Sequence, residues 1–213
     1  MTSVRPLLRA AELRAALLPD AVEALDDMLV DLVEEPSRLG RLFPAAARRT
    51  ARGQIAGTDH RVEDAVRVEL VAAAASRLSP PDLLAELQAV YRYGDADEKR
   101  AVLLALGAVD DREVDGSDVL LDALRTNDVR LVAAAMGPHA DRLSIHDWRH
   151  GVLKCLFVGV PLAGVAGLAT RADDELAAMV RRYVDERRAA GRPVPDDALM
   201  LLDLITSTTA QEA

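Results

Sequence analysis

Apolar residues recur every three or four positions along most of the chain, which is the spacing of one face of an α-helix. Between residues 20 and 35, for example, the apolar stripe consists of Leu25, Met28, Leu29 and Leu32. Acidic residues such as Asp27 fall on the opposite side of the same segment. No apolar pattern longer than six residues fits the two-residue period of a β-strand better. The pattern therefore predicts an all-α protein without a sheet.

The apolar pattern and the residues that interrupt it place the expected helices at 4–18, 20–35, 61–77, 80–93, 96–109, 117–125, 128–136, 145–158, 173–190 and 196–205. Asp95 and Glu98 are three residues apart and predict a capping box at the start of the helix 96–109. Ser144 is the expected N-cap of the helix 145–158. Local signals of this kind fix where a helix begins more firmly than where it ends.

Pairs of Ala- and Leu-rich helices joined by tight turns predict a HEAT-like right-handed helical stack of antiparallel helix pairs. The sequence contains no clean internal repeat that would define the stack further. We expect a single domain over residues 1–205, with the polar loop 53–60 as the best candidate for an internal break. The polar residues 206–213 are expected to form a disordered tail.

Composition limits the kind of core and the location of the protein. Half of the 213 residues are hydrophobic but only 3% are aromatic, so the core must consist mainly of Leu, Val and Ala. The single Cys cannot form an internal disulfide, and the first residues contain no apolar core of a signal peptide, so we expect a cytoplasmic protein. The uncharged segment 155–170 is shorter than the roughly 20 residues of a membrane span and contains Pro161. We therefore expect a buried helical hairpin there.

The segment 37–52 contains five Arg residues and no acid within a chain of net charge -9. Clustered guanidinium groups suit phosphate and carboxylate geometry. This segment is a candidate anion patch for a phosphate, a carboxylate or an acidic lipid surface, and its alternative is a solvated helix face. The overall negative charge disfavours nucleic acid as a partner. The residues of the candidate anion patch are Arg38, Arg41, Arg48, Arg49 and Arg52.

The rarest side chains of the chain gather between residues 146 and 173. This stretch contains the only Trp, the only Cys, two of the four His and one of the two Lys residues. Its polar face repeats every four residues, at His146, His150 and Lys154. The residues expected on the more apolar side are Trp148, Val152, Cys155 and Phe157.

We predict a polar pocket in the C-terminal half because a flat indole wall and converging donors are typical of small-molecule sites. Its expected lining is Asn127, His146, Trp148, Lys154, Arg171 and Asp173. The alternative is a buried polar network that fixes the helix register, with Trp148 in the core and Arg171 tied to Glu175 or Asp173. We also expect Lys99 and Lys154 to be partly buried and paired with carboxylates.

Four stretches between about residues 83 and 198 resemble the EboA family of metabolite-traffic proteins: YRYGDADEKRAVLLAL, LRTNDV, DWRHGVLKCLFVGVPLAGVAGLATRADDELAAMV and YVDERRAAGRPV. The family-like positions are Tyr91, Gly94, Asp95, Glu98, Lys99, Arg125, Asn127, Trp148, Lys154, Phe157, Arg171, Asp173, Glu186 and Arg187. The resemblance implies an all-helical bacterial protein of secondary metabolism. Its gene would lie in a cluster with a membrane prenyltransferase and with sugar- or cyclitol-processing enzymes.

Two departures from the family pattern predict a different ligand for this member if the positions concerned contact the ligand. Family members tend to have Trp-Asn-Gln where this chain has Trp148, Arg149 and His150. They also tend to have an Asn-Pro-Tyr-Pro-like loop where this chain has MGPHADR.

Two classes of function follow from these observations. The first is a non-catalytic binding, trafficking or scaffold protein for a small metabolite, anionic or prenyl-linked, that works with the biosynthetic enzymes of the cluster. The second is an enzyme acting on a cyclitol or an isoprenoid, with Lys154, His146 or His150 as acid or base. We expect no cofactor and no metal, because His146 and His150 lack a third ligand at a suitable spacing. Cys155 lies in an apolar run and is expected to be an inert core residue.

Overall fold

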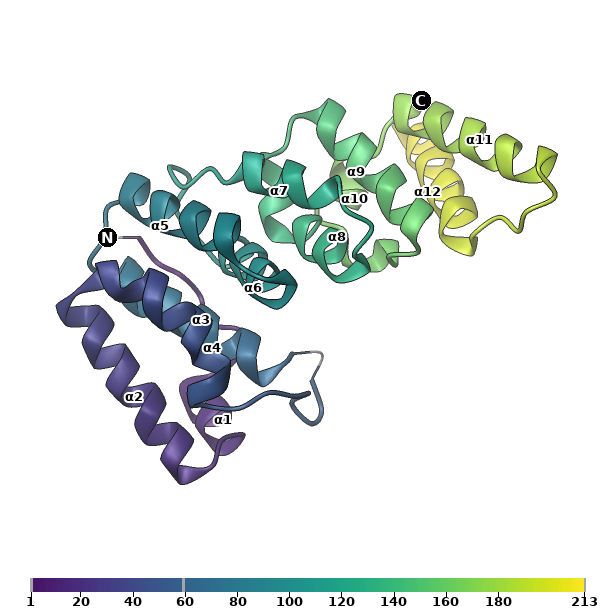
Figure 1. The fold of residues 1–213 in the computed structure, drawn as a ribbon. Helices are drawn as coiled ribbons and strands as arrows, with labels where there is room; N and C mark the ends of the chain where they lie inside the picture. The colour runs from purple at the N-terminus through teal and green to yellow at the C-terminus, as the bar shows by residue number, and fades with distance from the viewer. Residues whose placement is uncertain (1, 59, 213) are drawn as a thin grey trace. The chain divides into compact units, whose positions relative to one another are not determined.

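A computed structural model describes residues 2–58 and 60–212, with side chains up to residue 207. The regular secondary structure of these residues is helical, which confirms the all-α prediction (Figure 1). Extended pairing in the described part of the chain is limited to two isolated bridges, Val4 with Val109 and Gln54 with Arg61. The HEAT-like arrangement of helix pairs stays a prediction.

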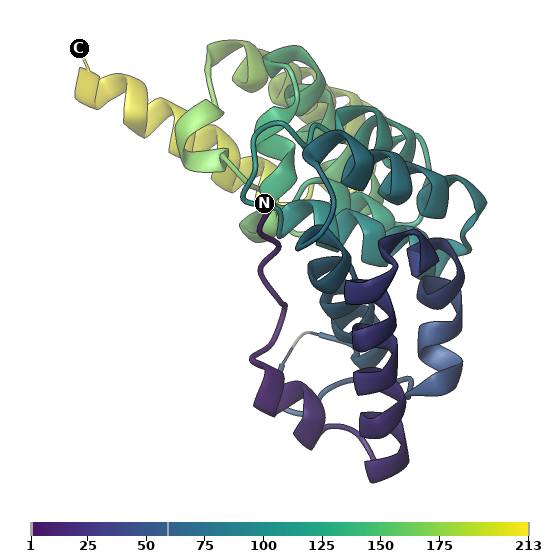
Figure 2. The same ribbon diagram turned by 90° about the vertical axis from the view of Figure 1, so that its left-hand side faces the viewer.

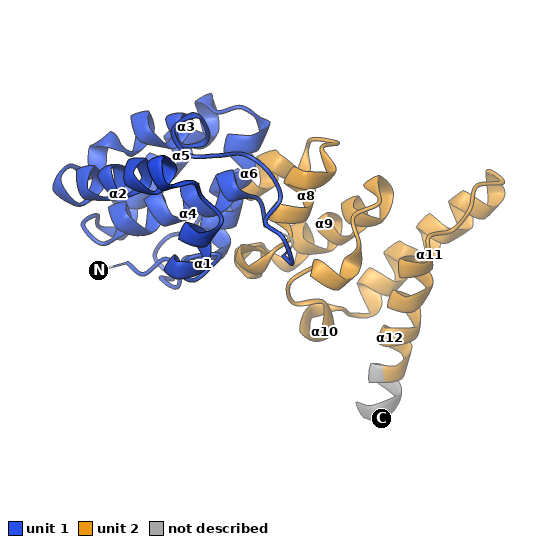
Figure 3. Cartoon of the chain, turned by 90° about the horizontal axis from the view of Figure 1, so that it is seen from below, with its two compact units in different colours: residues 1–119 blue, residues 120–213 orange. Residues whose placement is uncertain are grey.

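The chain forms two compact units, residues 1–119 and 120–213 (Figure 3). The expectation of one domain stays a prediction. The loop 53–60, expected as the internal break, lies inside the first unit and does not separate the two. It is closed by hydrogen bonds from the Ile55 amide to the His60 carbonyl, 2.9 Å, and from the Val62 amide to the Gly53 carbonyl, 2.8 Å.

The first unit is built around one helix, α4, which is buried on almost every side and packs against α2, α3 and α6. Its buried residues include charged side chains, namely Glu63, Asp64 and Arg67. The capping box predicted at Asp95 and Glu98 is confirmed at the start of α6. The elements of this unit are α1 (Ala10–Ala15), α2 (Pro19–Glu34), η1 (Pro36–Arg38), α3 (Leu39–Arg49), α4 (Val62–Ala75), α5 (Pro80–Tyr93), α6 (Ala96–Gly107) and the first turn of α7 (Ser117–Leu124).

The expected helix 4–18 is wrong over its first half, because residues before α1 run extended (Figure 2). The Arg5 amide donates to the Ala108 carbonyl over 2.8 Å, and the Asp110 amide donates to the Ser3 carbonyl over 3.0 Å. Pro6 has no backbone N–H to contribute to a helix. A partner distant in sequence therefore replaces the helical hydrogen bonds that the local pattern suggested.

The second unit is a series of helices in which α8 packs on α9, α9 on α11 and α11 on α12 (Figure 1). Ser144 is confirmed as the N-cap of α9, its Oγ accepting from the Asp147 amide at 3.1 Å. The elements are the rest of α7, then α8 (Val129–Ala135), η2 (Pro138–Arg142), α9 (Ile145–Val158), η3 (Leu162–Gly164), α10 (Leu168–Arg171), α11 (Asp174–Ala189) and α12 (Asp196–Glu212).

The helical hairpin expected over 155–170 is wrong. The helix α9 ends at Val158 and is capped by Gly159, whose φ of 82° suits glycine, and a 3₁₀ turn and the short α10 follow. Several residues of this stretch are exposed, including Phe157. Within the described residues, no helix combines the length and the apolar character needed to cross a membrane.

The helix α12 extends to Glu212, beyond the expected end at 205 and through most of the predicted tail. Two of its polar residues, Thr206 and Ser207, bond back along the helix. The Thr206 hydroxyl donates to the Leu202 carbonyl over 2.9 Å, and the Ser207 hydroxyl donates to the Asp203 carbonyl over 2.8 Å. The last residue, 213, lies outside the described residues.

Candidate functional site

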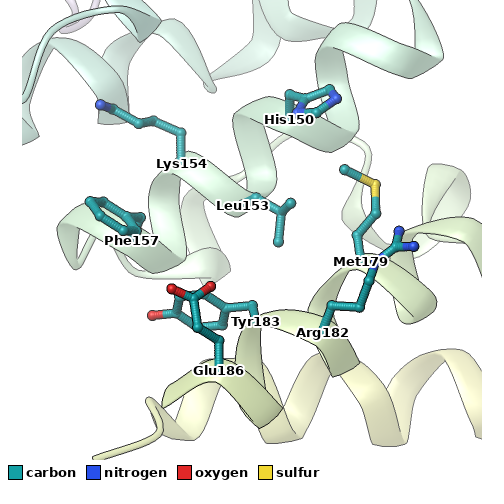
Figure 4. Close-up of a pocket in the computed structure, with 8 residues that line it drawn as sticks. All are labelled: His150, Leu153, Lys154, Phe157, Met179, Arg182, Tyr183 and Glu186. Atoms are coloured by element: carbon teal, nitrogen blue, oxygen red, sulfur yellow. The ribbon is translucent and has the colours of Figure 1, made fainter. Parts of the chain in front are cut away.

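A groove of about 470 Å³ lies between α9 and α11 in the second unit (Figure 4). Each helix contributes four residues at the spacing i, i+3, i+4 and i+7, so each presents one face to the groove. The lining residues are His150, Leu153, Lys154 and Phe157 from α9, and Met179, Arg182, Tyr183 and Glu186 from α11. The volume is within the range of small-molecule sites, roughly 300–1,000 Å³.

The orientation of α9 follows from its buried side. Trp148, Val152 and Cys155 are fully buried and anchor one side of the helix in the core of the second unit. Phe157 was expected on that side, but it is 69% exposed and lines the groove. It follows Trp148 by nine positions, which at about 100° per residue places it on the opposite side of the helix. The position of Phe157 opposite Trp148 could therefore have been read from a helical projection of the sequence.

Lys154 is the positive charge at the α9 edge of the groove. Its Nζ donates to the Oδ1 of Asn127, in the loop between α7 and α8, over 2.7 Å. The lysine is half-buried and the asparagine is exposed. The expected carboxylate partner is wrong for Lys154, which forms no ion pair with a carboxylate of the described residues. Lys154 therefore lines the groove, but its ammonium group is bonded to a neutral amide and points away from α11 (Figure 4).

The aromatic wall contributed by α11 is held in place by its own contacts. The Tyr183 hydroxyl donates to the Leu156 carbonyl over 3.2 Å. The Arg187 guanidinium carbon lies 5.7 Å from the centre of the Tyr183 ring, and its Nε donates to the Pro193 carbonyl over 2.6 Å. These contacts fix the ring before any ligand arrives, which lowers the entropy lost on binding.

Two imidazoles stand beside the groove. The rings of His146 and His150 are 4.5 Å apart between centroids, and both side chains are exposed. His150 lines the groove, whereas His146 contacts it only through His150. Among the residues that the structure describes, no group of three or more His, Cys, Asp or Glu side chains is arranged to hold a metal. The absence of a resident metal stays a prediction.

A family model described as "Metabolite traffic protein EboA" matches residues 44–203, which is most of the chain and includes every residue of the groove. The chain belongs to the EboA family. The match begins well before the region 83–198 on which the resemblance rested, so α4 also belongs to the family region. No significant match was found among curated proteins or among solved structures.

Three of the six residues predicted to line an EboA ligand pocket instead connect elements of the second unit. Trp148 is fully buried, and its Nε1 donates to the Ala166 carbonyl over 2.9 Å. Arg171 lies over the Trp148 ring at 5.0 Å and donates to the Ala140 and Leu143 carbonyls over 2.9 and 2.7 Å. These contacts fit the alternative of a buried polar network.

Asp173, the third of these residues, acts at the start of α11. It accepts from the Leu176 amide at 3.0 Å and pairs with Arg149, whereas the sequence suggested Arg171 as a partner. Of the six predicted residues, therefore, only Lys154 lines the groove, while Asn127 and His146 contact residues that line it. The ligand-binding role of the set stays a prediction.

The other EboA-like positions divide between the two units. In the first unit, Asp95 and Glu98 cap α6, and the added Cβ of any residue replacing Gly94 would lie 2.8 Å from the Val90 carbonyl oxygen. The half-buried Lys99 has its Nζ 4.9 Å from the centre of the Tyr91 ring. It forms no ion pair with a carboxylate of the described residues, so the carboxylate partner expected for it is also wrong.

In the second unit, the remaining EboA-like positions lie at or near the groove. Phe157 and Glu186 line it, and Arg187 supports its wall. Arg125, just after α7, is exposed.

Only some of the arginines of the candidate anion patch are free of ion pairs with carboxylates of the described residues. Arg38 pairs with Asp31 and Glu35, and Arg52 lies 3.8 Å from Asp97. The remaining members form no ion pair with the described carboxylates and are exposed on one side of α3: Arg41, Arg48 and Arg49. Binding of an anion there stays a prediction.

Cys155 is confirmed as a core residue. It is fully buried and free, and burial raises the pKa of its thiol to about 12. A thiol with such a pKa is not ionised at neutral pH and is a poor nucleophile. The Cys155 thiol is also not among the residues that line the groove.

Proposed function

We propose that this EboA-family chain is a non-catalytic carrier that holds a small metabolite in the groove between α9 and α11. The observation that carries the proposal is the pairing of two facing helix sides, largely apolar, with one ammonium group at their edge. This is the usual composition of a small-molecule site: apolar walls for affinity and a few polar groups for orientation. The family description supports metabolite traffic as the setting.

The finer features of the role follow from the family setting. The carrier would serve biosynthetic enzymes encoded in the same cluster, a prenyltransferase among them, by presenting an anionic or prenyl-linked metabolite. A carrier must release its cargo. An open groove with a 69% exposed Phe157 at its edge suits exchange better than an enclosed cavity does. The cytoplasm is the expected location.

Native mass spectrometry of the chain, purified gently from a producing cell, tests the proposal. We expect a co-purifying mass that is lost in Phe157→Ser. The matched control is Tyr93→Ser, because Tyr93 is also a highly exposed aromatic residue but lies on α5, in the first unit. Loss of the mass in both variants, or in neither, would place the ligand outside the groove and contradict the proposal.

The alternative function is an enzyme acting on a cyclitol or an isoprenoid. One observation favours it: His150, whose ring is tilted against that of His146 at 4.5 Å, stands one helical turn from Lys154 at the same groove. In that role an imidazole or the amine would transfer a proton to or from the bound substrate. A bound metabolite recovered unchanged from the wild type, and equally from His150→Gln, supports the carrier. A product that disappears in His150→Gln supports the enzyme.

A further inference from the structure

The charges around the groove differ in how far they are compensated. Arg182 lies 3.5 Å from Glu175, so a carboxylate already accompanies this cation. Lys154 donates to the amide oxygen of Asn127 and to no carboxylate of the described residues. An amide oxygen satisfies one N–H but leaves the positive charge uncompensated. An anion that reached Lys154 would therefore gain a charge-assisted bond without displacing an existing ion pair.

The rest of the groove is suited to an apolar body. Leu153, Phe157, Met179 and Tyr183 form its walls, and Figure 4 shows Leu153 pointing from α9 toward α11. Covering an exposed aromatic ring such as Phe157 removes apolar surface from water, and complete burial of a Phe side chain is worth roughly 1.5–3 kcal/mol. Methionine adapts to ligands of irregular shape.

Glu186 restricts the charge of the ligand. Its carboxylate lines the same groove beside Tyr183 and forms no ion pair with a described residue (Figure 4). A second anionic group on the ligand would be repelled there, whereas a hydroxyl group could donate to the carboxylate. The lining thus favours one negative charge, at the Lys154 edge.

We propose that the groove takes an amphipathic molecule with an apolar body and a single anionic group, and that this group binds the Lys154 Nζ in place of the Asn127 amide oxygen. This inference rests on the proposed function, because it names the ligand class of the same groove. Asn127 then acts as a positioning residue that holds the ammonium group beside α9, directed away from α11, while no ligand is bound (Figure 4).

Two dyes that share an aromatic body test the role of charge. Anilinonaphthalene sulfonate carries one sulfonate, and phenylnaphthylamine has the same ring system without it. Each is titrated by fluorescence into the folded full chain and its variants. We expect Lys154→Met to weaken binding of the sulfonate dye about tenfold, the typical effect of one charge-assisted hydrogen bond, and to leave the neutral dye unchanged.

Three further variants complete the design. Lys99→Met removes the only other lysine of the chain, in the first unit, and should leave both dyes unchanged. Phe157→Ser should weaken both dyes, since it removes part of the apolar wall. Glu186→Gln should strengthen binding of the sulfonate dye alone. Circular dichroism and the melting temperature verify that each variant is folded.

The outcomes separate the two proposals. If Lys154→Met weakens both dyes equally or neither of them, Lys154 does not select for charge and the inference is wrong, while the groove can still be the carrier site. If Phe157→Ser affects neither dye, the dyes bind elsewhere, and the groove fails both as an amphipathic site and as the proposed carrier site. An effect of Lys154→Met on the sulfonate dye alone supports the inference. Added salt should then weaken binding of the sulfonate dye to the wild type.

Discussion

Lys154 and Asn127 are 27 positions apart in the chain, and a single hydrogen bond of 2.7 Å from the Lys154 Nζ to the Asn127 Oδ1 joins them. The bond connects α9 to the loop between α7 and α8 at the edge of the groove. Both residues belong to family-like motifs that are separate in sequence. Their contact in the structure joins those two motifs at one point of the second unit.

Asn127→Asp should weaken binding of an anionic ligand. The new carboxylate would compensate the charge of Lys154 and compete with the ligand for it, so we expect about fivefold weaker binding of the sulfonate dye. Asn127→Ala is the control, because it removes the hydrogen bond without adding a charge. Since the bond is exposed, we expect its melting temperature to change by less than about 2 °C. Equal dye affinity in both variants would mean that the ligand does not bind Lys154.

Trp148→Phe should destabilise the second unit. The indole is fully buried and donates to the Ala166 carbonyl, so the change leaves both a cavity and an unpaired carbonyl. We expect a loss of about 2–3 kcal/mol in the free energy of unfolding, measured by urea denaturation. Phe157→Leu, at an exposed position of the same helix, should change it by less than about 0.5 kcal/mol. A Trp148→Phe variant that is as stable as the wild type but binds ligand more weakly would instead support the prediction that Trp148 lines a ligand pocket.

Glu69→Gln should stabilise the chain at neutral pH. Burial raises the pKa of the Glu69 carboxyl above its usual 4.5, and the charge of Arg14 offsets this only in part. When a carboxyl has a higher pKa in the folded state than in the unfolded state, the protein loses stability as the pH rises from the unfolded-state pKa through the folded-state pKa. The gain in melting temperature from Glu69→Gln should therefore grow as the pH increases above about 4.5 and vanish below it.

The melting temperatures of wild type and Glu69→Gln between pH 4 and pH 8 provide this measurement. The control is Glu34→Gln at the exposed end of α2, where we expect no change. A gain from Glu69→Gln that is the same at every pH would show that ionisation is not its cause.

Asp95→Ala should weaken the start of α6. The Asp95 side chain accepts from the Glu98 amide at 2.9 Å, and the Glu98 carboxylate accepts from the Asp95 amide at 3.1 Å. Loss of an N-cap of this kind destabilises a helix by about 1 kcal/mol. Asp27→Ala, at an exposed position within α2, is the matched control. Chemical denaturation of the two variants measures the difference, and equal stabilities would contradict a capping role.

The sequence predicted most helices because their signals are local. The expected segment 80–93 coincides with α5 (Pro80–Tyr93), where Pro80 and Pro81 fix the start. The helix expected over 4–18 is wrong in its first half because the backbone near Val4 pairs with Val109. A local sequence pattern carries no information on so distant a partner. Periodicity identifies the apolar face of a helix but not which neighbour covers it.

Only the half of the groove that α9 contributes could be predicted from the sequence. The spacing of His150, Lys154 and Phe157 already placed them on one face of α9, although Phe157 was assigned to the other side. That Met179 and Tyr183 face them depends on how α11 packs on α9, which is a tertiary contact. Trp148 lies in the core and not at the groove, and the sequence could not distinguish the two because a buried core residue and a ligand-facing one have the same sequence signal.

The buried thiol of Cys155 makes the chain a convenient object for spectroscopy. Because the only native cysteine is fully buried and its pKa is raised to about 12, it should not react with maleimides while the protein is folded. A cysteine introduced by substitution, for example Arg182→Cys at the groove, would then be the single labelling site without any need to replace a native residue. Fluorophores and spin labels could report on the groove directly in the otherwise unaltered chain.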